Sequence, residues 1–180
     1  MSPSLPAASL PLLCHSAGEV GILSFTTVKG PNGWLSNMAP FPIAYNGRRY
    51  RTSEALFQCL RFDGEPEVQE RIRAQASPMA AKWTAGDYAA RLRVPLRDDA
   101  DLDRMRLCLR LKLAQHPMLL ARLTGTGCNV LVEDCYARPT DPEIDGSVVC
   151  YPFWGMVRSR GVWRGYNALG CLWMELRDVA

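Results

Sequence analysis

The sequence predicts a single domain built mainly of helices, with a few short strands. Its 180 residues suit one domain, and 48% hydrophobic with 22% charged residues is an ordinary balance for a soluble globular protein with a core of its own. Several segments repeat apolar residues at helical spacing, whereas the β-rich runs are short and separated. The chain shows no internal repeat and no low-complexity block, so we expect no second domain.

The first twenty residues differ from the rest in composition. Residues 1–20 contain mainly Pro, Ser, Ala and Leu, lack a basic segment, and have an apolar run that Pro6 and Pro11 interrupt. This pattern fits neither a signal peptide nor a membrane span. We therefore predict a flexible N-terminal tail at 1–20 and a folded domain at 21–180.

Charge and cysteine content limit the partners and cofactors. The net charge of +3 is too small to indicate nucleic acid by itself, although basic clusters at 104–112 and 158–164 permit such a partner. The seven cysteines form no C-x-x-C pair, and with only His15 and His116 available no zinc-binding spacing can be assembled. We predict no metal or other cofactor, no membrane partner, and free cysteines in a reducing, cytoplasmic compartment.

The first elements are a strand, a packed loop and a hairpin. Residues 21–28 are rich in apolar and β-branched side chains, which is typical of a strand. Residues 34–43 contain two prolines that forbid a helix, so we predict a packed loop that presents Ser36 and Asn37. Asn46-Gly47 then indicates a type I′ turn between two short strands, because both residues tolerate positive φ. The hairpin leads directly into the next helix.

The stretch from Thr52 onward predicts a helix with a polar face. Thr52 or Ser53 can cap its first turn, and Glu54 stands where the helix dipole favours an anion, so we expect its carboxyl to be ionised. Glu54 and Gln58 lie four residues apart and share one face, which Arg61 joins. This polar group is suited to holding a sugar hydroxyl or a phosphate. The alternative is an ordinary solvated face.

Four further helices are predicted before the next strand. Apolar periodicity, proline starts and turn residues indicate helices at 66–74, 78–86, 98–116 and 117–123. Lys82 lies on the second of these helices. Lys112 falls on or beside the apolar stripe of the third helix, where its stem should pack against the core. The alternative for Lys112 is that its ammonium escapes to water.

A buried strand is predicted next, and it ends in two carboxylates. The β-rich residues 128–132 are followed directly by Glu133 and Asp134, at a strand end where loops commonly carry function. A helix cap or a surface turn is an equal alternative for these two acids. Residues 137–147, rich in Pro, Asp and Gly, then predict a long loop.

The C-terminal part contains an aromatic cluster and a final helix. Residues 151–155 include Tyr, Phe and Trp beside a glycine, which suits the stacking of a planar base, although such clusters also occur in cores. Residues 171–179 show helical spacing of apolar side chains, and Asn167 can cap this helix.

Several motifs occur in a characteristic order. They are Ser36-Asn37, Pro42-Ile43, Thr52-Ser53-Glu54 with Phe57-Gln58, Ala81-Lys82, Lys112 with Gln115-His116-Pro117, Leu131-Val132-Glu133, Trp154-Gly155, and Gly165-Tyr166-Asn167-Ala168-Leu169-Gly170. In this order and spacing the chain resembles the NADAR family, also called YbiA-like proteins. The resemblance covers residues 22–178, and its specificity comes from the ordered set and not from any single motif.

The resemblance implies an α+β, mostly helical single domain that cleaves N-glycosidic bonds without a metal. Members of the family act on phosphoribosylated pyrimidine intermediates of riboflavin synthesis, or remove ADP-ribose from guanine bases in nucleic acid. The implied partner is therefore an ADP-ribose or phosphoribosyl-type substrate, free or carried on modified DNA or RNA. A catalytically silent ADP-ribose-binding module is an alternative of a different class.

Two departures from the family pattern fall near the Trp-Gly pair. Family members commonly carry an Asp three residues before that pair, where this chain has Tyr151, and Asp145 is the nearest acidic residue upstream. This change motivates the non-catalytic alternative. The loop after the pair is usually rich in Gly, Asp and Lys, whereas here it carries Arg158, Arg160 and Arg164. Arginines suit a phosphate or pyrophosphate, so we prefer an ADP-ribosylated guanine as substrate.

The expected chemistry assigns roles to these residues. Cleaving a C1′–N bond creates an oxocarbenium-like centre, so the site needs negative charge, a group that hydrogen-bonds or protonates the base, and an activated water or nucleophile. Glu54 is the first candidate carboxylate, and Glu133 or Asp134 the second. Lys82 or Lys112 could form a Schiff base with an opened ribose. The substrate-binding candidates are Asn37, Gln58, Asp134, Trp154, Gly155, Arg158 and Asn167.

Overall fold

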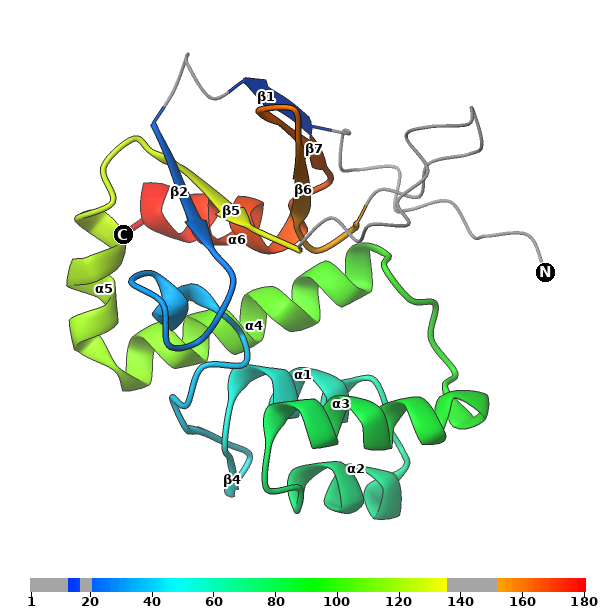
Figure 1. The fold of residues 1–180 in the computed structure, drawn as a ribbon. Helices are drawn as coiled ribbons and strands as arrows, with labels where there is room; N and C mark the ends of the chain where they lie inside the picture. Colours follow the sequence, from blue (N-terminus) through cyan, green and yellow to red (C-terminus); the bar gives the residue numbers. More distant parts are fainter. Residues whose placement is uncertain (1–12, 17–20, 136–151) are drawn as a thin grey trace, which may run out of the picture.

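The structure of the protein is a computed structural model that describes residues 13–16, 21–135 and 152–180 (Figure 1). Its α-helices are α1 (Ser53–Leu60), α2 (Pro66–Arg73), α3 (Pro78–Asp87), α4 (Asp99–Gln115), α5 (Pro117–Thr124) and α6 (Ala168–Asp178). Its strands are β1 (Leu13–Ser16), β2 (Ile22–Phe25), β3 (Ile43–Tyr45), β4 (Arg48–Tyr50), β5 (Val130–Glu133), β6 (Met156–Ser159) and β7 (Val162–Gly165). The predicted α+β architecture, mostly helical, is confirmed. No helix within these ranges is long and apolar enough to cross a lipid bilayer.

The described strands form three small sheets. β1, β7 and β6 make an antiparallel sheet in that order, β2 and β5 pair in parallel, and β3 and β4 form a hairpin. β1 lies within the segment predicted to be a flexible tail, so part of that segment pairs with β7. The rest of the predicted tail, 1–12 and 17–20, lies outside the described residues, as do the predicted loop at 137–147 and Tyr151.

The two hairpins show different sequence signals. The β3–β4 turn at Asn46-Gly47 has φ values of 46° and 71°, which confirms the predicted turn. The β6–β7 turn at Arg160-Gly161 has φ values of 47° and 81°, in a segment that the sequence analysis described as a loop. That interpretation was incomplete, because arginine rarely adopts a positive φ and does not mark a tight turn.

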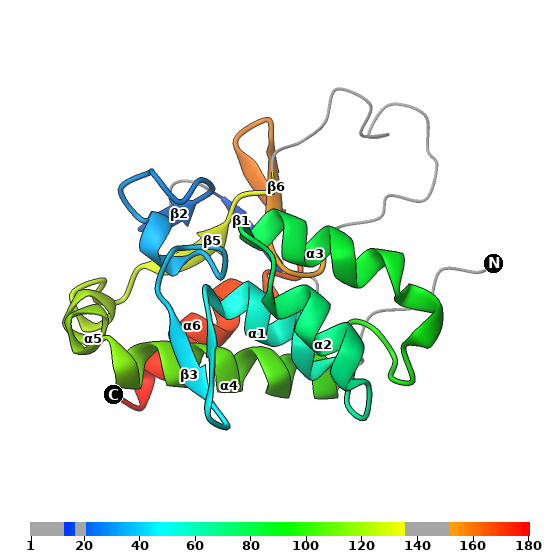
Figure 2. The same cartoon turned by 90° about the horizontal axis from the view of Figure 1, so that it is seen from below.

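Helix α4 separates two groups of elements. In Figure 1 the α1, α2 and α3 helices lie below α4, whereas α6 and the β2–β5 pair lie above it, and Figure 2 shows the same elements from below. The predicted apolar stripe of α4 is confirmed, because Leu102, Met105, Leu109 and Leu113 are all buried. Together with the apolar side chains of α1 and α6, this stripe forms the main core.

The loop before the hairpin is anchored by buried side chains from α4 and α6. Lys112 donates hydrogen bonds from Nζ to the carbonyl oxygens of Trp34 (2.5 Å) and Ser36 (3.0 Å), and its side chain is fully buried. Trp173 donates from Nε1 to the carbonyl of Leu35 at 2.8 Å. Three successive carbonyls are thus satisfied from the core, which fixes the position of the next residue, Asn37.

Candidate active site

A cleft of about 330 Å³ opens between α1, α3, the segment before α4, and the residues around β5 and Trp154. It collects polar and aromatic side chains from distant parts of the sequence. The predicted site residues that line it are Asn37, Glu54, Gln58, Lys82, Glu133 and Trp154. Within the described residues, the cleft therefore brings together two carboxyl groups, Glu54 and Glu133, and one lysine, Lys82.

Glu54 is fixed at the start of α1. The Thr52 hydroxyl accepts a hydrogen bond from the Ala55 N–H at 3.2 Å, which confirms the predicted cap, and Glu54 follows in the first turn with only 3% of its surface exposed. Asn37 donates from Nδ2 to one carboxyl oxygen of Glu54, and Gln58 donates from Nε2 to the other at 2.8 Å. The Glu54 N–H in turn donates to the Asn37 carbonyl at 2.9 Å. The carboxyl orientation is therefore set by both neighbours.

Burial changes the expected electrostatics of Glu54. Loss of solvent raises the pKa of this carboxyl, and the Gln58 hydrogen bond and the charges of Lys82 and Arg61 oppose that shift. The sequence prediction that the helix start keeps Glu54 ionised considered only the dipole. In the structure the burial of the side chain outweighs the groups that favour the anion.

Glu133 is the second carboxyl of the cleft, and it stands at the end of β5. Its backbone pairs with Phe25 of β2, and its N–H donates to Oδ1 of Asn167 at 3.2 Å. Burial, with a smaller contribution from the negative charge of Glu54, raises the pKa of Glu133 to about 7, although the positive charge of Lys82 opposes the shift. The two carboxyls and Lys82 therefore form one electrostatically coupled group.

Lys82 projects from α3 into the cleft and is solvent-exposed. Its positive charge lowers the pKa of both Glu54 and Glu133. Within 13–16, 21–135 and 152–180 its ammonium makes neither a hydrogen bond nor an ion pair. The amine is therefore exposed in the same cleft that the two carboxyl groups line.

A buried ion pair supports the polar face of α1. Arg61 packs its guanidinium over the Phe57 ring, 4.2 Å from its centroid, and donates to Gln58 Oε1 at 3.4 Å. It also donates from Nε to Asp101 at 3.0 Å, with a second, shorter contact from Nη2. Asp101 is fully buried at the start of α4. The row from Glu54 to Asp101 is thus held by consecutive hydrogen bonds.

Trp154 forms an aromatic wall of the cleft. Its ring packs edge-on against Phe57, with centroids 5.3 Å apart, and against Phe153 at 5.0 Å. Gly155 lets the chain pass close to β5, because a Cβ there would stand 2.3 Å from the Glu133 carbonyl oxygen. The tryptophan is therefore held beside the second carboxyl.

Comparison with known proteins places this architecture in a family. Residues 24–179 match the profile of a protein family described as "NADAR domain". The chain belongs to the NADAR family. Two similar relatives are proteins named N-glycosidase YbiA from Escherichia coli (strain K12) and Shigella boydii serotype 4 (strain Sb227), each 34% identical over 160 residues that cover 87% of both chains. The NMR structure of the E. coli protein YbiA matches with a TM-score of 0.68 and 32% identity, covering 88% of this chain and 84% of that chain.

Some predicted site residues of this NADAR protein lie outside the cleft lining. Lys112 is buried behind the Trp34–Ser36 loop, and the predicted alternative of an ammonium in water is wrong for it. Asn167 is also buried, and its Nδ2 donates to the Leu131 carbonyl at 2.8 Å. It occupies the N-cap position of α6, but its side chain makes no capping bond, because both amide atoms contact β5.

Three more predicted residues do not line the cleft. Asp134 forms a β-bridge with Met156 beyond β5, and Gly155 contributes the close approach described above. Both are next in sequence to residues that line the cavity. Arg158 is exposed on β6, and its guanidinium lies 5.8 Å from the centroid of the Trp163 ring.

Sequence reasoning missed one charged residue of the cleft, Arg97. It lines the cavity from the segment before α4, with a positive φ of 62°. No residue type in that segment marks such a backbone, so the sequence offered no signal for it. Cys135, the residue after the predicted Glu133-Asp134 pair, also lines the cleft.

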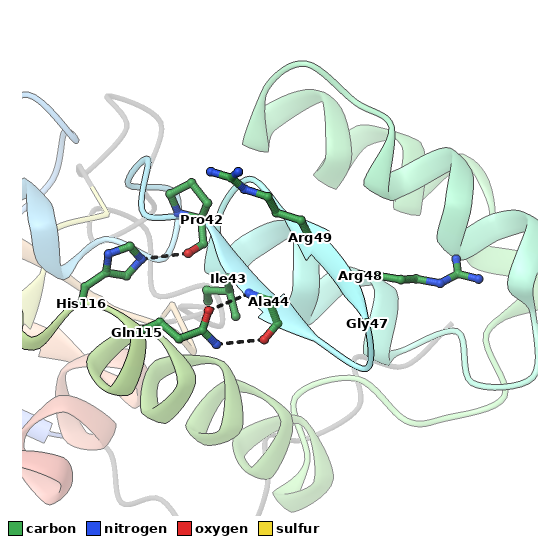
Figure 3. Close-up of a pocket in the computed structure, with 8 residues that line it drawn as sticks. All are labelled: Pro42, Ile43, Ala44, Gly47, Arg48, Arg49, Gln115 and His116. Atoms are coloured by element: carbon green, nitrogen blue, oxygen red, sulfur yellow. Dashed lines mark hydrogen bonds between the residues drawn. The ribbon is translucent and has the colours of Figure 1, made fainter.

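Gln115 and His116, which belong to the NADAR motifs, line a second pocket of about 490 Å³ beside the β3–β4 hairpin. Figure 3 shows the Gln115 amide facing Ala44, where it both donates to the carbonyl and accepts from the N–H at 2.8 Å. His116 Nε2 lies 2.8 Å from the Pro42 carbonyl oxygen. None of the described residues that line this pocket carries a carboxylate. The Gln115 and His116 side chains instead attach β3 and the preceding Pro42 to the end of α4.

Proposed function

We propose that this NADAR protein is an N-glycosidase that hydrolyses the C1′–N bond between ADP-ribose and a guanine base. The observation that carries the proposal is the meeting of Glu54, Glu133 and Lys82 in one cleft beside Trp154. The name N-glycosidase of the relatives supports the same class of reaction.

The two carboxyl groups suit complementary roles. Burial raises the pKa of Glu54, but the Gln58 hydrogen bond and the charges of Lys82 and Arg61 favour its anion, which would stabilise positive charge as the C1′–N bond lengthens. Glu133, with a pKa raised to about 7, can hold a proton near neutral pH and give it to the departing base nitrogen. The negative charge of Glu54 disfavours ionisation of Glu133 and so helps it to keep that proton.

Lys82 is the candidate for a covalent bond to the sugar. After its ammonium loses a proton to solvent, the amine attacks C1′ as the C1′–N bond breaks and the base leaves with the proton of Glu133. The attached nitrogen gives a proton to Glu54, and Glu54 passes it to O4′ as the C1′–O4′ bond breaks, which leaves a protonated Schiff base. Water hydrolyses the Schiff base to free ADP-ribose and the lysine ammonium, and Glu133 regains its proton from solvent. Direct attack by water at C1′ is the competing route, and it leaves no covalent adduct. Each step uses side chains of the cleft.

The surroundings of the cleft support a nucleic-acid substrate. Trp154 offers an aromatic surface for the guanine. The β6–β7 hairpin begins directly after Gly155 and exposes Arg158 and Arg160. Exposed arginines on a hairpin that follows the Trp154-Gly155 pair in sequence could contact the phosphates that flank a modified base.

A direct assay tests the proposal. The protein is incubated with a synthetic oligonucleotide that carries one ADP-ribosylated guanine, and released ADP-ribose is measured by mass spectrometry. We expect turnover by the wild type, a fall in kcat of about 10²–10⁴-fold for Glu133→Gln and a comparable loss for Glu54→Gln. Glu67→Gln, an exposed carboxyl on α2 outside the cleft lining, is the matched control and should keep wild-type activity.

The same assay separates the alternatives. Turnover of a phosphoribosylated riboflavin-pathway intermediate, without release from modified guanine, would assign the cleft to a small metabolite. Tight calorimetric binding of ADP-ribose with no turnover of either compound would identify a binding module. Absence of ADP-ribose release from modified guanine contradicts the proposal.

A further inference from the structure

Arg97 is held at the rim of the cleft in a strained backbone conformation. Its φ of 62° lies in the left-handed region, which non-glycine residues rarely occupy. The conformation is stabilised because the Arg97 N–H donates to Oδ2 of Asp101 at 2.8 Å. Asp98, the N-cap of α4, follows directly and accepts from the Asp101 N–H at 2.9 Å. These hydrogen bonds therefore fix the backbone of Arg97 at the rim of the cleft.

The guanidinium of Arg97 is not needed to neutralise the buried carboxylate of Asp101. The buried Asp101 carboxylate already has two guanidinium partners, Arg61 and Arg104, the latter at 3.2 Å. Within the described ranges the Arg97 side chain has neither an ion pair nor a hydrogen bond, and it is exposed at the cavity. The fixed backbone thus presents the Arg97 guanidinium to the cleft, and no described residue pairs with it.

The segment that carries Arg97 is also attached at its beginning. Arg91 and Arg93 both donate to the carboxylate of Glu65, which is itself buried, and the Arg93 contact measures 3.2 Å. The segment is therefore held at both ends, by Glu65 and by Asp101. Side chains presented from such a pinned segment lose less freedom when they bind a ligand.

We infer that Arg97 binds a phosphoryl group carried on C5′ of the ribosyl substrate. The inference rests on the proposed N-glycosidase function, which assigns the carboxyl groups of Glu54 and Glu133 to the C1′ end of the substrate. A planar guanidinium with five N–H donors matches the oxygens of a phosphoryl group in bidentate geometry. A neutral sugar would leave this cation unused. Arg97 is thus a specificity residue for the 5′-phosphoryl end of the substrate, whether that end is a monophosphate or the pyrophosphate of ADP-ribose.

Binding measurements with two probes test the inference. Ribose 5-phosphate and ADP-ribose are titrated by calorimetry into the full chain at low salt. We expect Arg97→Met and Arg97→Gly to raise the Kd of the phosphorylated probes about 10–100-fold. Arg71→Met removes an exposed arginine on α2, outside both the cleft lining and the segment that carries Arg97, and it should change Kd less than about twofold. A larger loss for ADP-ribose than for ribose 5-phosphate assigns the pyrophosphate as the source.

The glycine variant separates binding from stability. Glycine adopts a positive φ without strain, so Arg97→Gly should raise Tm relative to Arg97→Met, while both variants lose phosphoryl binding equally. Wild-type Kd in the Arg97 variants overturns the inference, as does an equal loss in Arg71→Met or failure of the wild type to bind either probe. If binding depends on Arg97 but modified guanine is never cleaved, the proposed reaction fails and this inference stands.

Discussion

The environments of Lys82 and Lys112 differ in almost every respect, although both lysines were candidates for the covalent catalyst. Lys82 is exposed in the cleft and interacts with two carboxyl groups. Lys112 is fully buried, and burial alone lowers its pKa to about 7. Its Nζ lies 5.0 Å from the Phe41 ring centroid and 5.4 Å from that of Trp173, with two carbonyl acceptors.

The contrast shows that a lowered pKa does not by itself identify a reactive lysine. A neutral amine retains two N–H donors, so Lys112 can satisfy the carbonyls of Trp34 and Ser36 even after it loses its proton. It is placed to hold the loop that carries Asn37. Reactivity at a sugar requires access and neighbouring carboxyl groups, and Lys82 has both.

The largest expected effect concerns covalent trapping. The chain contains three lysines, Lys29, Lys82 and Lys112, so an adduct reduced with borohydride can be mapped without ambiguity among them. We expect the adduct on Lys82, and a loss of kcat on the order of 10³-fold or more in Lys82→Met. Lys112→Met should still form the adduct, and Lys29→Met is the surface control. An adduct on Lys112 would reverse the roles of the two lysines.

The second effect is a pH dependence of stability due to Lys112. Its pKa is near 7 when folded and near 10.5 when exposed, so the unfolded state binds the proton more strongly between these values. The free energy of unfolding of the wild type, relative to Lys112→Met, should therefore rise with pH from about 7 to 10, by roughly 1.4 kcal/mol per unit at most. Denaturant unfolding at several pH values measures it. The control is Lys29→Met, an exposed lysine for which no such rise is expected. If the difference in free energy of unfolding between wild type and Lys112→Met did not change with pH, the assigned effect of burial would be contradicted.

A smaller effect is expected from the second anchor of the loop. Trp173→Phe keeps an aromatic ring but leaves the buried Leu35 carbonyl without its donor. We expect the free energy of unfolding to fall by about 2 kcal/mol, measured by urea denaturation. Trp83→Phe, at a largely exposed position on α3, is the control and should change it by less than about 0.5 kcal/mol. Equal losses in the two variants would mean that the Leu35 bond does not stabilise the loop.

The smallest effect is a shift in the titration of Glu133. Because the charge of Lys82 lowers the pKa of this carboxyl, Lys82→Met should raise it above its value near 7. Carboxyl carbon NMR of the folded protein measures the shift. Lys112 is not among the groups that act on Glu133, so Lys112→Met should leave the titration unchanged. A shift of equal size in both variants would place the two lysines in one electrostatic group.

Features with local sequence signals could be predicted. The Thr52 cap, the Asn46-Gly47 turn and the proline at the start of α3 each depend on residues within a few positions, and the structure confirms all three. The family motifs also indicated Glu54, Lys82 and Glu133, which the cleft brings together.

Features that depend on distant neighbours could not be predicted. The role of Lys112 depends on the Trp34 and Ser36 carbonyls, more than seventy positions away, as the separations of 78 and 76 residues show. The pKa of Glu54 follows from its burial, which helix position does not reveal. The backbone of Arg97 depends on Asp101, and an arginine carries no signal for a positive φ.

The parallel pairing of β2 with β5 has a consequence for the order of folding. Glu133 is positioned opposite Phe25, so the pair closes a chain segment on the order of a hundred residues, an entropically slow step until the intervening helices have packed. Asn167 then bonds the backbone of Glu133 from the start of α6. During synthesis Glu54 and Lys82 emerge long before this strand pair can close. The protein therefore acquires its second carboxyl late, and a chain that ends before α6 lacks the residue that holds Glu133 in place.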